Sequence, residues 1–384
     1  MFMHRLMISL VALLIIAFLD VPTAAMVQPG QPSTSISQPA PSGLAVVIED
    51  VPQSSSLDLK TLNNPYISGV ALQIHWSDIE PVEGKPDWSK LDALFAAAQT
   101  SKKWVHLLIF PGFFTPAWAL KGVKTEMFAI QYGPGHGTVE KLAMPWNKLY
   151  LNRWFAFLSQ LSTRYGNSPA FRMVAADGPT SVSAECTLPN TPKDLKKWQS
   201  LGYLPSKYIG AWQQVFQVYS TDFPNQYISF SAGAGQVGIN DQGQIEPGGQ
   251  ASTRQAIVDA AMTTLGHRFV LQSSNVHAGA GPHSPNSETD DKFVIDYSGR
   301  VTTGLQMRSA AENSSGVMGA QGNAPLALRR SIDLAMEPNS AGQHINYLEI
   351  YEPDVLAEEM QSVLSYGASL FKPRPPVLPR TTPQ

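Results

Sequence analysis

Two glutamates in this sequence of 384 residues are the strongest candidates for proton-transfer chemistry. Glu185 lies in the segment GPTSVSAECTLP, and Glu349 lies in the apolar run NYLEIYEP. Burying an unpaired carboxylate is costly, so a glutamate within an apolar run usually has a partner or a function. A pair of carboxyl groups, one protonated and one ionised, can act as general acid and as general base or nucleophile. We therefore take Glu185 and Glu349 as the candidate catalytic pair.

Asp177 competes with Glu185 for the role of the acid. It lies near the end of the predicted strand FRMVAADGP, directly before Gly178 and Pro179, where an aspartate typically caps a turn with its side chain. Glu185 follows in a loop, and a loop that curls back over the strand end can bring this longer side chain to a substrate. We therefore favour Glu185 as the acid and keep Asp177 as a candidate substrate contact.

Glu349 has two interpretations. Side chains alternate between the faces of a strand, so Glu349 shares a face with Tyr347 and Tyr351, and a tyrosine hydroxyl could keep the carboxylate ionised. The other interpretation is a structural ion pair with Arg308 or Arg329. The carboxylates that could replace Glu349 are Glu312 and Glu352.

Polar and aromatic residues also gather at the ends of the predicted strands. Taken singly, each can be explained as a helix cap or as a partner for loop backbone. As a set they suit a carbohydrate cleft, because sugar rings pack on aromatic faces and sugar hydroxyls bond to amides and carboxylates. The candidate substrate-binding residues are His75, Trp76, Trp118, Asp177, Asn275, His277, Gln306 and Tyr351.

Several other kinds of chemistry lack a supporting motif. The histidines form no H-x-x-x-H or H-E-x-x-H pair, so we expect no metal site. No glycine-rich phosphate loop follows the first predicted strand, and no G-x-S-x-G motif is present, so we expect no cofactor. Lys and Arg number 27 against 30 Asp and Glu, which leaves no excess of basic charge for binding nucleic acid.

Apolar, β-branched runs alternate with helical patterns over residues 44–371. Eight of these runs read as strands, each ending in Gly, Pro or polar residues. Strand followed by helix, repeated about eight times, is the pattern of a single-domain α/β protein with a (β/α)8 TIM barrel, and a doubly wound open sheet is the alternative. In a barrel, the carboxyl ends of all strands face one mouth, which would bring the candidate residues together. The predicted strands are 43–51, 67–76, 104–112, 171–179, 226–235, 268–279, 303–310 and 345–353.

The two ends of the chain have a different composition. Residues 1–25 have a basic start, an apolar core and small residues at the end, as a signal peptide does, so we expect a secreted or periplasmic protein without stable membrane insertion after cleavage. Residues 26–43 and 372–384 are rich in Pro, and we expect a disordered linker and tail there. The loop 277–291 reads either as a lid over the mouth or as a solvated insertion. The single cysteine, Cys186, excludes an internal disulfide.

Two motifs carry a resemblance to a known family. The stretch IHWSDIEPVEGKPDWSKLDALFAAA, followed after a strand by FPGFFTPAWAL, resembles the second and third βα units of retaining (β/α)8 glycoside hydrolases, particularly the β-galactosidase-like ones. The resemblance implies a glycosidase that acts on an oligo- or polysaccharide with retention of configuration. It also implies that Trp76 sits at the barrel mouth and that Trp118 forms a wall for a sugar.

The resemblance is incomplete at the catalytic positions. That clan carries its acid/base glutamate after an Asn at the end of strand four, and its nucleophile at the end of strand seven. Here strand four ends VAADGPTSVSAECTLP without an Asn-Glu pair, and the seventh predicted strand has no glutamate before Glu312. If the strand count were off by one, Glu349 would fall on strand seven. A barrel that binds carbohydrate without cleaving it is therefore the alternative function.

Overall fold

The computed structural model describes residues 38–50, 56–133, 135–233, 237–246, 250–279 and 290–371. The predicted signal peptide, most of the predicted linker, the Pro-rich tail and most of the loop 277–291 lie outside these ranges. None of the helices within the ranges combines the length and the apolar character that crossing a bilayer requires.

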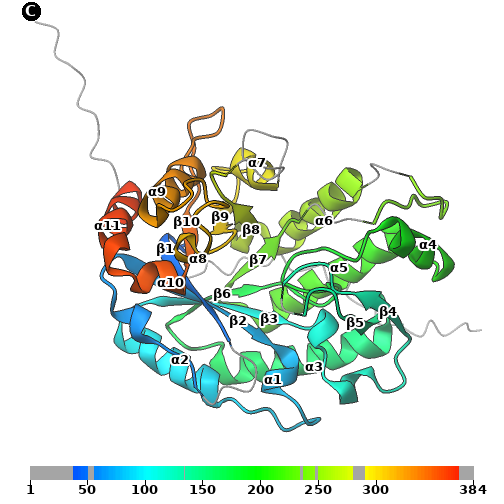
Figure 1. Cartoon of the computed structure of the whole chain (residues 1–384). Helices are drawn as coiled ribbons and strands as arrows, with labels where there is room; N and C mark the ends of the chain where they lie inside the picture. The colour runs from blue at the N-terminus through cyan, green and yellow to red at the C-terminus, as the bar shows by residue number, and fades with distance from the viewer. Residues whose placement is uncertain are drawn as a thin grey trace, which may run out of the picture. The chain divides into compact units, whose positions relative to one another are not determined.

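In the described residues, eight parallel strands form a closed barrel, which confirms the predicted (β/α)8 fold (Figure 1). Neighbouring strands are hydrogen-bonded in the order β1-β10-β9-β8-β7-β6-β3-β2, and β2 pairs with β1 to close the barrel. The run NYLEIYEP provides the eighth barrel strand, so Glu349 does not fall on strand seven. The strands are β1 (Gly43–Glu49), β2 (Ile67–His75), β3 (Trp104–Phe110), β6 (Phe171–Ala175), β7 (Tyr227–Ser231), β8 (Phe269–Val276), β9 (Thr302–Met307) and β10 (Tyr347–Tyr351).

The alternation of side chains along the strands explains how the barrel is filled. Both faces of a parallel sheet are buried, one against helices and one inside the barrel. In β1, Leu44, Val46 and Ile48 belong to the core beneath the helices. Ala45 and Val47 pack instead with side chains from other strands inside the barrel. The interior of an eight-stranded barrel is just wide enough for such side chains to fill it.

Helices surround the barrel, as Figure 1 shows, and each long helical pattern of the sequence corresponds to one of them. β1 is the exception to the strand-helix alternation, because the described residues after it form the short 3-10 helix η1 (Lys60–Asn63). The long helices are α2 (Ser89–Thr100), α3 (Lys148–Tyr165), α5 (Pro205–Asp222), α6 (Gln250–Leu265), α9 (Ala324–Ala335) and α11 (Gln361–Leu370). The shorter ones are α1 (Trp76–Ile79), α4 (Pro192–Ser200), α7 (Asp290–Asp296), α8 (Ala311–Ser314) and α10 (Glu352–Leu356).

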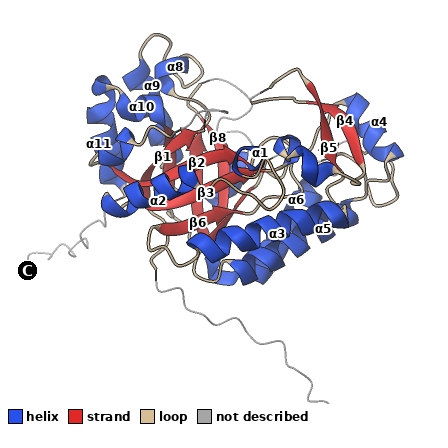
Figure 2. Ribbon diagram, turned by 90° about the horizontal axis from the view of Figure 1, so that it is seen from below, coloured by secondary structure: helices blue, strands red, loops and turns tan. Residues whose placement is uncertain are grey.

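An antiparallel hairpin that was not expected from the sequence extends the loop after β3 (Figure 2). Phe128 of the hairpin stacks on Trp198 of α4, with 4.5 Å between the ring centroids. Gln131 Nε2 donates a hydrogen bond to Asp194 Oδ2, also on α4, at 3.0 Å. The hairpin is therefore anchored to α4 beside the barrel. Its strands are β4 (Thr125–Ala129) and β5 (Val139–Ala143).

Large side chains close the end of the barrel at which the strands begin. Trp104 and Tyr347 lie in one interior cluster, with 5.8 Å between their ring centroids. A Cβ added at Gly69 would lie 2.2 Å from the ring of Trp104, and one added at Gly304 would lie 2.0 Å from that of Tyr347. Trp104 Nε1 also donates to the carbonyl oxygen of Ser42 at 3.1 Å. This packed end leaves the other end, called the mouth below, as the place for a site.

Candidate active site

Glu185 reaches the mouth through an excursion of the chain. β6 ends at Ala175, the N–H of Ala176 still donates to the carbonyl oxygen of Ser229 on β7, residues 177–184 leave the sheet, and the chain then returns to pair with β7. Glu185 forms a parallel bridge with Ser231, and the N–H of Cys186 donates to the carbonyl oxygen of Ser231 at 3.1 Å. The loop therefore curls back over the strand end, as the sequence predicted, and holds Glu185 at the mouth.

The environment of Glu185 favours its protonated form. Burial is the main cause, and the charges of Asp290 and Asp291 add to it, so that the pKa of Glu185 is raised to about 7. Both aspartates lie in the first turn of α7. Asp290 pairs with Arg254 at 2.6 Å, and Asp291 accepts a hydrogen bond from Ser273 Oγ at 2.6 Å. A carboxyl group with such a pKa keeps its proton close to neutral pH and can serve as a general acid.

Glu349 lies deeper, inside the barrel. Its side chain is 0% exposed. Both carboxylate oxygens are engaged: Oε1 lies 2.7 Å from Nδ1 of His106, and Oε2 accepts a hydrogen bond from Nε2 of Gln272 at 2.8 Å. His106 and Gln272 thus take the place of Arg308 and Arg329, the ion-pair partners that the sequence suggested.

The layer around Glu349 is a closed polar network. The second ring nitrogen of His106, Nε2, lies 2.8 Å from Ser229 Oγ, and Tyr347 OH donates to Gln272 Oε1 at 2.7 Å. All five side chains are buried. Solvent does not reach Glu349 in this network, whereas Glu185 is half-buried beside the end of β7, so the two predicted catalytic glutamates lie in different surroundings.

Gln306 and Tyr351 form the floor of the mouth. Tyr351 follows Glu349 by two residues on the same face of β10, which places it ~7 Å further along the strand. Gln73 Nε2 donates to Gln306 Oε1 at 3.1 Å, and Gln306 Nε2 donates to Tyr351 OH at 3.0 Å. Burial raises the pKa of Tyr351, and negative charges nearby raise it further. These charges are those of Glu49, Glu349 and Glu185.

The two tryptophans predicted to bind substrate occupy different places. Trp76 is fully buried, and its ring packs edge to face against Trp154 of α3, with 5.1 Å between the centroids. The structure therefore does not place Trp76 at the mouth, because its ring fills the gap between the barrel and α3. Trp118 is partly exposed. Glu80 ties both together, since its Oε2 accepts from Trp76 Nε1 at 3.1 Å and its carbonyl oxygen accepts from Trp118 Nε1 at 2.8 Å.

His75 and Asp177 both lie near strand ends, but their surroundings differ. His75 ends β2 and stacks on Phe114, with 3.7 Å between the ring centroids, which places a flat aromatic surface near the mouth. Asp177 is buried, and its Oδ1 accepts hydrogen bonds from Thr180 Oγ1 at 2.7 Å and from the N–H of Gly178 at 3.2 Å. Burial raises the pKa of Asp177 well above its usual value. The turn-capping role predicted for Asp177 is confirmed.

Asn275 and His277 lie at the end of β8. Asn275 is half-buried, and His277 is buried with its Nε2 3.3 Å from Nη1 of Arg308. The alternative carboxylates Glu312 and Glu352 lie in the first turns of α8 and α10, outside the strands. The predicted residues that the structure gathers at the mouth include His75, Glu185, Gln306 and Tyr351.

Two residues at the mouth were missed from the sequence. Glu49 ends β1, and the period-two alternation of that strand could have identified it. Tyr132 lies in the hairpin connection, and its hydroxyl donates to Thr187 Oγ1 at 2.6 Å. Burial raises the pKa of Tyr132 and the charge of Glu185 adds to it, so the hairpin reaches the neighbourhood of Glu185. No pattern in the short polar segments around Tyr132 predicts this.

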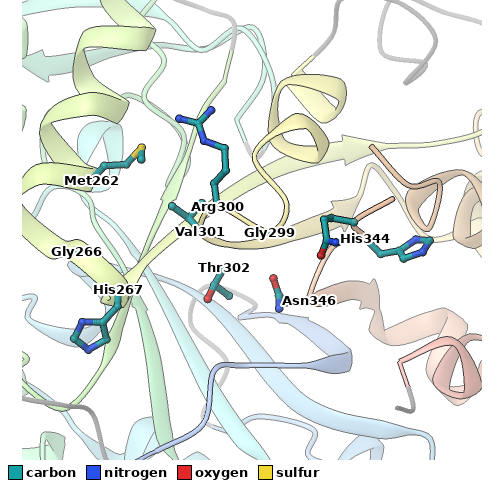
Figure 3. Close-up of a pocket in the computed structure, with 10 residues that line it drawn as sticks. Met262, Gly266, His267, Gly299, Arg300, Val301, Thr302, His344 and Asn346 are labelled. Atoms are coloured by element: carbon teal, nitrogen blue, oxygen red, sulfur yellow. The ribbon is translucent and has the colours of Figure 1, made fainter. Parts of the chain in front are cut away.

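A cavity of about 620 Å³ lies at the opposite, closed end of the barrel. Figure 3 shows His267, Arg300 and His344 around it, together with residues just before β9 and β10. It contains none of the candidate residues, so we assign no catalysis to it. Within the described ranges, no group of three or more His, Cys, Asp or Glu side chains is arranged to hold a metal ion.

The chain is similar to a known protein family and to solved structures. The model of a glycoside hydrolase family, family 42, described as β-galactosidase, matches residues 51–232, a little under half of the chain. The catalytic domain of β-amylase from Paenibacillus polymyxa has a TM-score of 0.51 at 10% identity, over 86% of this chain and 99% of that one. An exo-β-1,4-mannosidase from Opitutaceae bacterium strain TAV5 has a TM-score of 0.48 at 12% identity, over 86% of this chain and 60% of that one. No curated protein sequence matches the chain.

The β-amylase likeness concerns the fold, and the family match concerns the activity. The closed barrel and the match to a glycoside hydrolase family model together identify the protein as a glycosidase with a (β/α)8 barrel. Among such enzymes, the chain resembles the β-galactosidase-like ones, as its motifs predicted. The prediction that the protein is a glycosidase is thereby confirmed.

Proposed function

We propose that this glycosidase is an exported enzyme that hydrolyses an O-glycosidic bond of an oligo- or polysaccharide with Glu185 as the general acid. The supporting observation is the place of Glu185 at the mouth, together with its pKa of about 7. The signal-like composition of residues 1–25 supports export. Aromatic and amide groups near the mouth can hold a sugar, and they include His75, Phe114, Gln306 and Tyr351.

In this mechanism, Glu185 gives its proton to the glycosidic oxygen as the bond to the anomeric carbon breaks. A second carboxylate must either attack that carbon or take a proton from a water molecule that attacks it. Retention, which the resemblance implies, needs carboxyl groups ~5–5.5 Å apart, whereas inversion needs ~6.5–9.5 Å. Glu349, the predicted partner, would first have to give up its contacts with His106 and Gln272.

The variant Glu185→Gln tests the role of the acid. With phenyl glycosides, whose leaving group needs a proton, we expect kcat/KM to fall by ~10²–10⁴. With 2,4-dinitrophenyl glycosides the loss should be far smaller, because that leaving group departs as an anion. The wild-type rate on phenyl glycosides should fall as the pH rises through about 7, because Glu185 then loses its proton.

Glu83→Gln is the matched control, since Glu83 is an exposed glutamate in the loop between α1 and α2. Its kinetic constants should equal those of the wild type with both substrates. A Glu185→Gln variant that keeps full activity, or that loses activity equally with both leaving groups, would exclude Glu185 as the acid. The activity of Glu349→Gln, measured in parallel, shows whether the buried carboxylate of Glu349 takes part in the reaction.

A barrel that binds a saccharide without cleaving it is the second candidate, and one observation favours it. The carboxylate predicted to work with Glu185 is fully buried and hydrogen-bonded in the barrel. Calorimetric binding of oligosaccharides, with no turnover of a panel of α- and β-linked aryl glycosides between about pH 4 and 8, would support this candidate and contradict the first.

A further inference from the structure

Tyr132 lies in the connection of the hairpin β4-β5 and reaches the surroundings of Glu185. It is 40% exposed, and its hydroxyl donates a hydrogen bond to Thr187 Oγ1 at 2.6 Å. We propose that the ring of Tyr132 binds the sugar on the leaving-group side of the scissile bond, which makes saccharides of two or more sugars the preferred substrates. This inference rests on the proposed function, in which Glu185 is the acid.

The contacts of Thr187 place Tyr132 beside the acid. Thr187, which accepts the hydrogen bond from Tyr132, follows Glu185 by two residues, and its N–H donates to the carbonyl oxygen of Glu185 at 2.7 Å. A Cβ added at Gly233 would lie 2.6 Å from Thr187 Cγ2 and 3.2 Å from Glu185 Oε2, so both side chains lie against this glycine. Burial raises the pKa of Tyr132, and the charge of Glu185 raises it further, as expected for neighbouring groups.

The hairpin is held in place on both sides of Tyr132. Gln131, the residue before it, is hydrogen-bonded to Asp194 of α4 at 3.0 Å. At Gly133, the residue after it, an added Cβ would lie 3.3 Å from Val182 Cγ1, in the excursion of the chain that precedes the acid. Because the hydroxyl of Tyr132 is bonded as well, its ring loses little conformational freedom when a ligand packs on it. An ordered and exposed aromatic ring suits a sugar, whose apolar face packs on it.

The position of Tyr132 assigns it to one side of the scissile bond. Gln306 and Tyr351 form the floor of the mouth on β9 and β10, whereas Tyr132 belongs to the hairpin beside the barrel (Figure 2). Glu185 lies at the boundary, because it pairs with β7 while Thr187, two residues later, contacts the hairpin. The acid gives its proton to the oxygen that joins the two sugars. A saccharide with this oxygen at Glu185 and the sugar to be released over the floor therefore extends its leaving group toward Tyr132.

Other aromatic rings near the mouth already pack on aromatic partners. Phe114 stacks on His75, with 3.7 Å between the ring centroids, and Trp118 meets Trp76 edge to face, with 5.6 Å between them. None of the ring contacts in the described part of the chain involves Tyr132. Its exposed surface is therefore open to a ligand.

The experiment compares Tyr132→Ala, Tyr132→Phe and the control Met127→Ala in the full chain. The substrates are β-1,4-linked disaccharides with galactose, glucose or mannose at the non-reducing end, and the 2,2,2-trifluoroethyl β-glycosides of the same three sugars. Both kinds of leaving group need a proton, but only the disaccharide carries a second sugar. We expect Tyr132→Ala to lower kcat/KM about tenfold for the disaccharide and to leave it unchanged for the trifluoroethyl glycoside.

Tyr132→Phe separates the ring from the hydroxyl. It keeps the ring and loses only the hydrogen bond to Thr187, so kcat/KM for both substrates should stay within about threefold of the wild type. Met127 is 40% exposed on the same hairpin, on the face of β4 opposite Phe128, so Met127→Ala should match the wild type with both substrates. The wild type itself should prefer the disaccharide to the trifluoroethyl glycoside about tenfold in kcat/KM, which tests the inference even if a variant fails to fold.

The outcomes distinguish the inference from the function on which it rests. A Tyr132→Ala variant with no loss, or with equal losses on both substrates, would overturn the role of Tyr132 and leave Glu185 as the acid. So would an equal loss in Tyr132→Phe or in Met127→Ala, or a wild type without preference for the disaccharide. Full activity of Glu185→Gln on the disaccharide would overturn the proposed function itself. Absence of wild-type turnover on the whole panel would contradict both.

Discussion

Two layers of the barrel interior hold carboxylates, and they differ in how these groups are satisfied. In the inner layer, Glu349 has His106 on one oxygen and Gln272 on the other, and solvent does not reach it. At the mouth, Glu185 and Glu49 are partly desolvated, and no cation among the described residues lowers the pKa of either. The inner group is complete without a ligand, whereas the outer two are not.

Burial alone therefore does not mark a catalytic carboxylate. A buried carboxyl group that is hydrogen-bonded through both oxygens is already stabilised by those partners. A carboxyl group that has lost water without gaining a cation holds its proton more firmly, which is the property that a general acid needs. The two layers therefore differ more clearly in whether their carboxyl groups have hydrogen-bond partners than in how deeply these groups are buried.

The largest effect is expected for Glu349→Ala, which breaks the inner layer. The substitution leaves His106 and Gln272 with unpaired polar groups in a space without solvent. Each buried polar group left without a partner costs about 1–3 kcal/mol, and the cavity adds to this, so the free energy of unfolding should fall by about 3–5 kcal/mol. Urea unfolding at about pH 7 measures this loss.

Glu337→Ala is the control for Glu349→Ala, because Glu337 is an exposed glutamate between α9 and β10. Its free energy of unfolding should differ from that of the wild type by less than about 0.5 kcal/mol. If the two variants were equally stable, the inner network would contribute nothing measurable, and the contrast between the layers would disappear.

Glu185→Gln tests the mouth by stability rather than by activity. The pKa of Glu185 is about 7 in the folded protein against an ordinary value of 4.5, so the folded state binds this proton more tightly than the unfolded state. The contribution of Glu185 to stability therefore falls as the pH rises from about 4.5 to about 7, by up to about 3 kcal/mol. Glu185→Gln carries no charge, so it should be more stable than the wild type at about pH 8 and equally stable at about pH 4. Thermal unfolding at both pH values measures the difference, and a difference that does not change with pH would contradict the raised pKa.

A smaller effect is expected for Gly304→Ala, which disturbs the inner layer indirectly. The ring of Tyr347 lies 2.0 Å from the place of the new Cβ, and the hydroxyl of Tyr347 holds Gln272. Moving the ring should lower the free energy of unfolding by about 1–3 kcal/mol. Gly210→Ala in α5, where a Cβ meets nothing within 4 Å, should be neutral or stabilising. Denaturant unfolding measures the free energy of unfolding of both variants. Equal values for the two would contradict tight packing around Tyr347.

The barrel strands could be predicted from the sequence because each is buried on both faces and so appears as an apolar run. The hairpin could not be predicted in the same way. Its strands TEMFA and VEKLA are short and contain charged residues, and their pairing depends on contacts such as Phe128 on Trp198. A local pattern identifies an element only when the element's own residues determine its burial.

The same limit explains what could be predicted of the site. The sequence predicts Glu185 at the mouth because this residue follows soon after a strand with a clear apolar pattern, and a short loop keeps it near the end of that strand. The partners of Glu349 were hidden, since His106 lies 243 residues away and Gln272 lies 77 residues away. Within one apolar run, a carboxylate looks the same whether it contacts a substrate or another side chain. Trp76 was misplaced for a similar reason, because its neighbour Trp154 belongs to a later helix.

The length of the excursion of residues 177–184 decides which residue rejoins the sheet beside Ser231. A residue at a strand end keeps its orientation whatever follows it, but Glu185 is aimed only by where the chain rejoins Ser231. One residue more or fewer in the excursion would turn Ala184 or Cys186 into that space. An alignment anchored on strand ends would therefore misplace Glu185, the proposed acid, and a loop one residue shorter would put the thiol of Cys186 in its place.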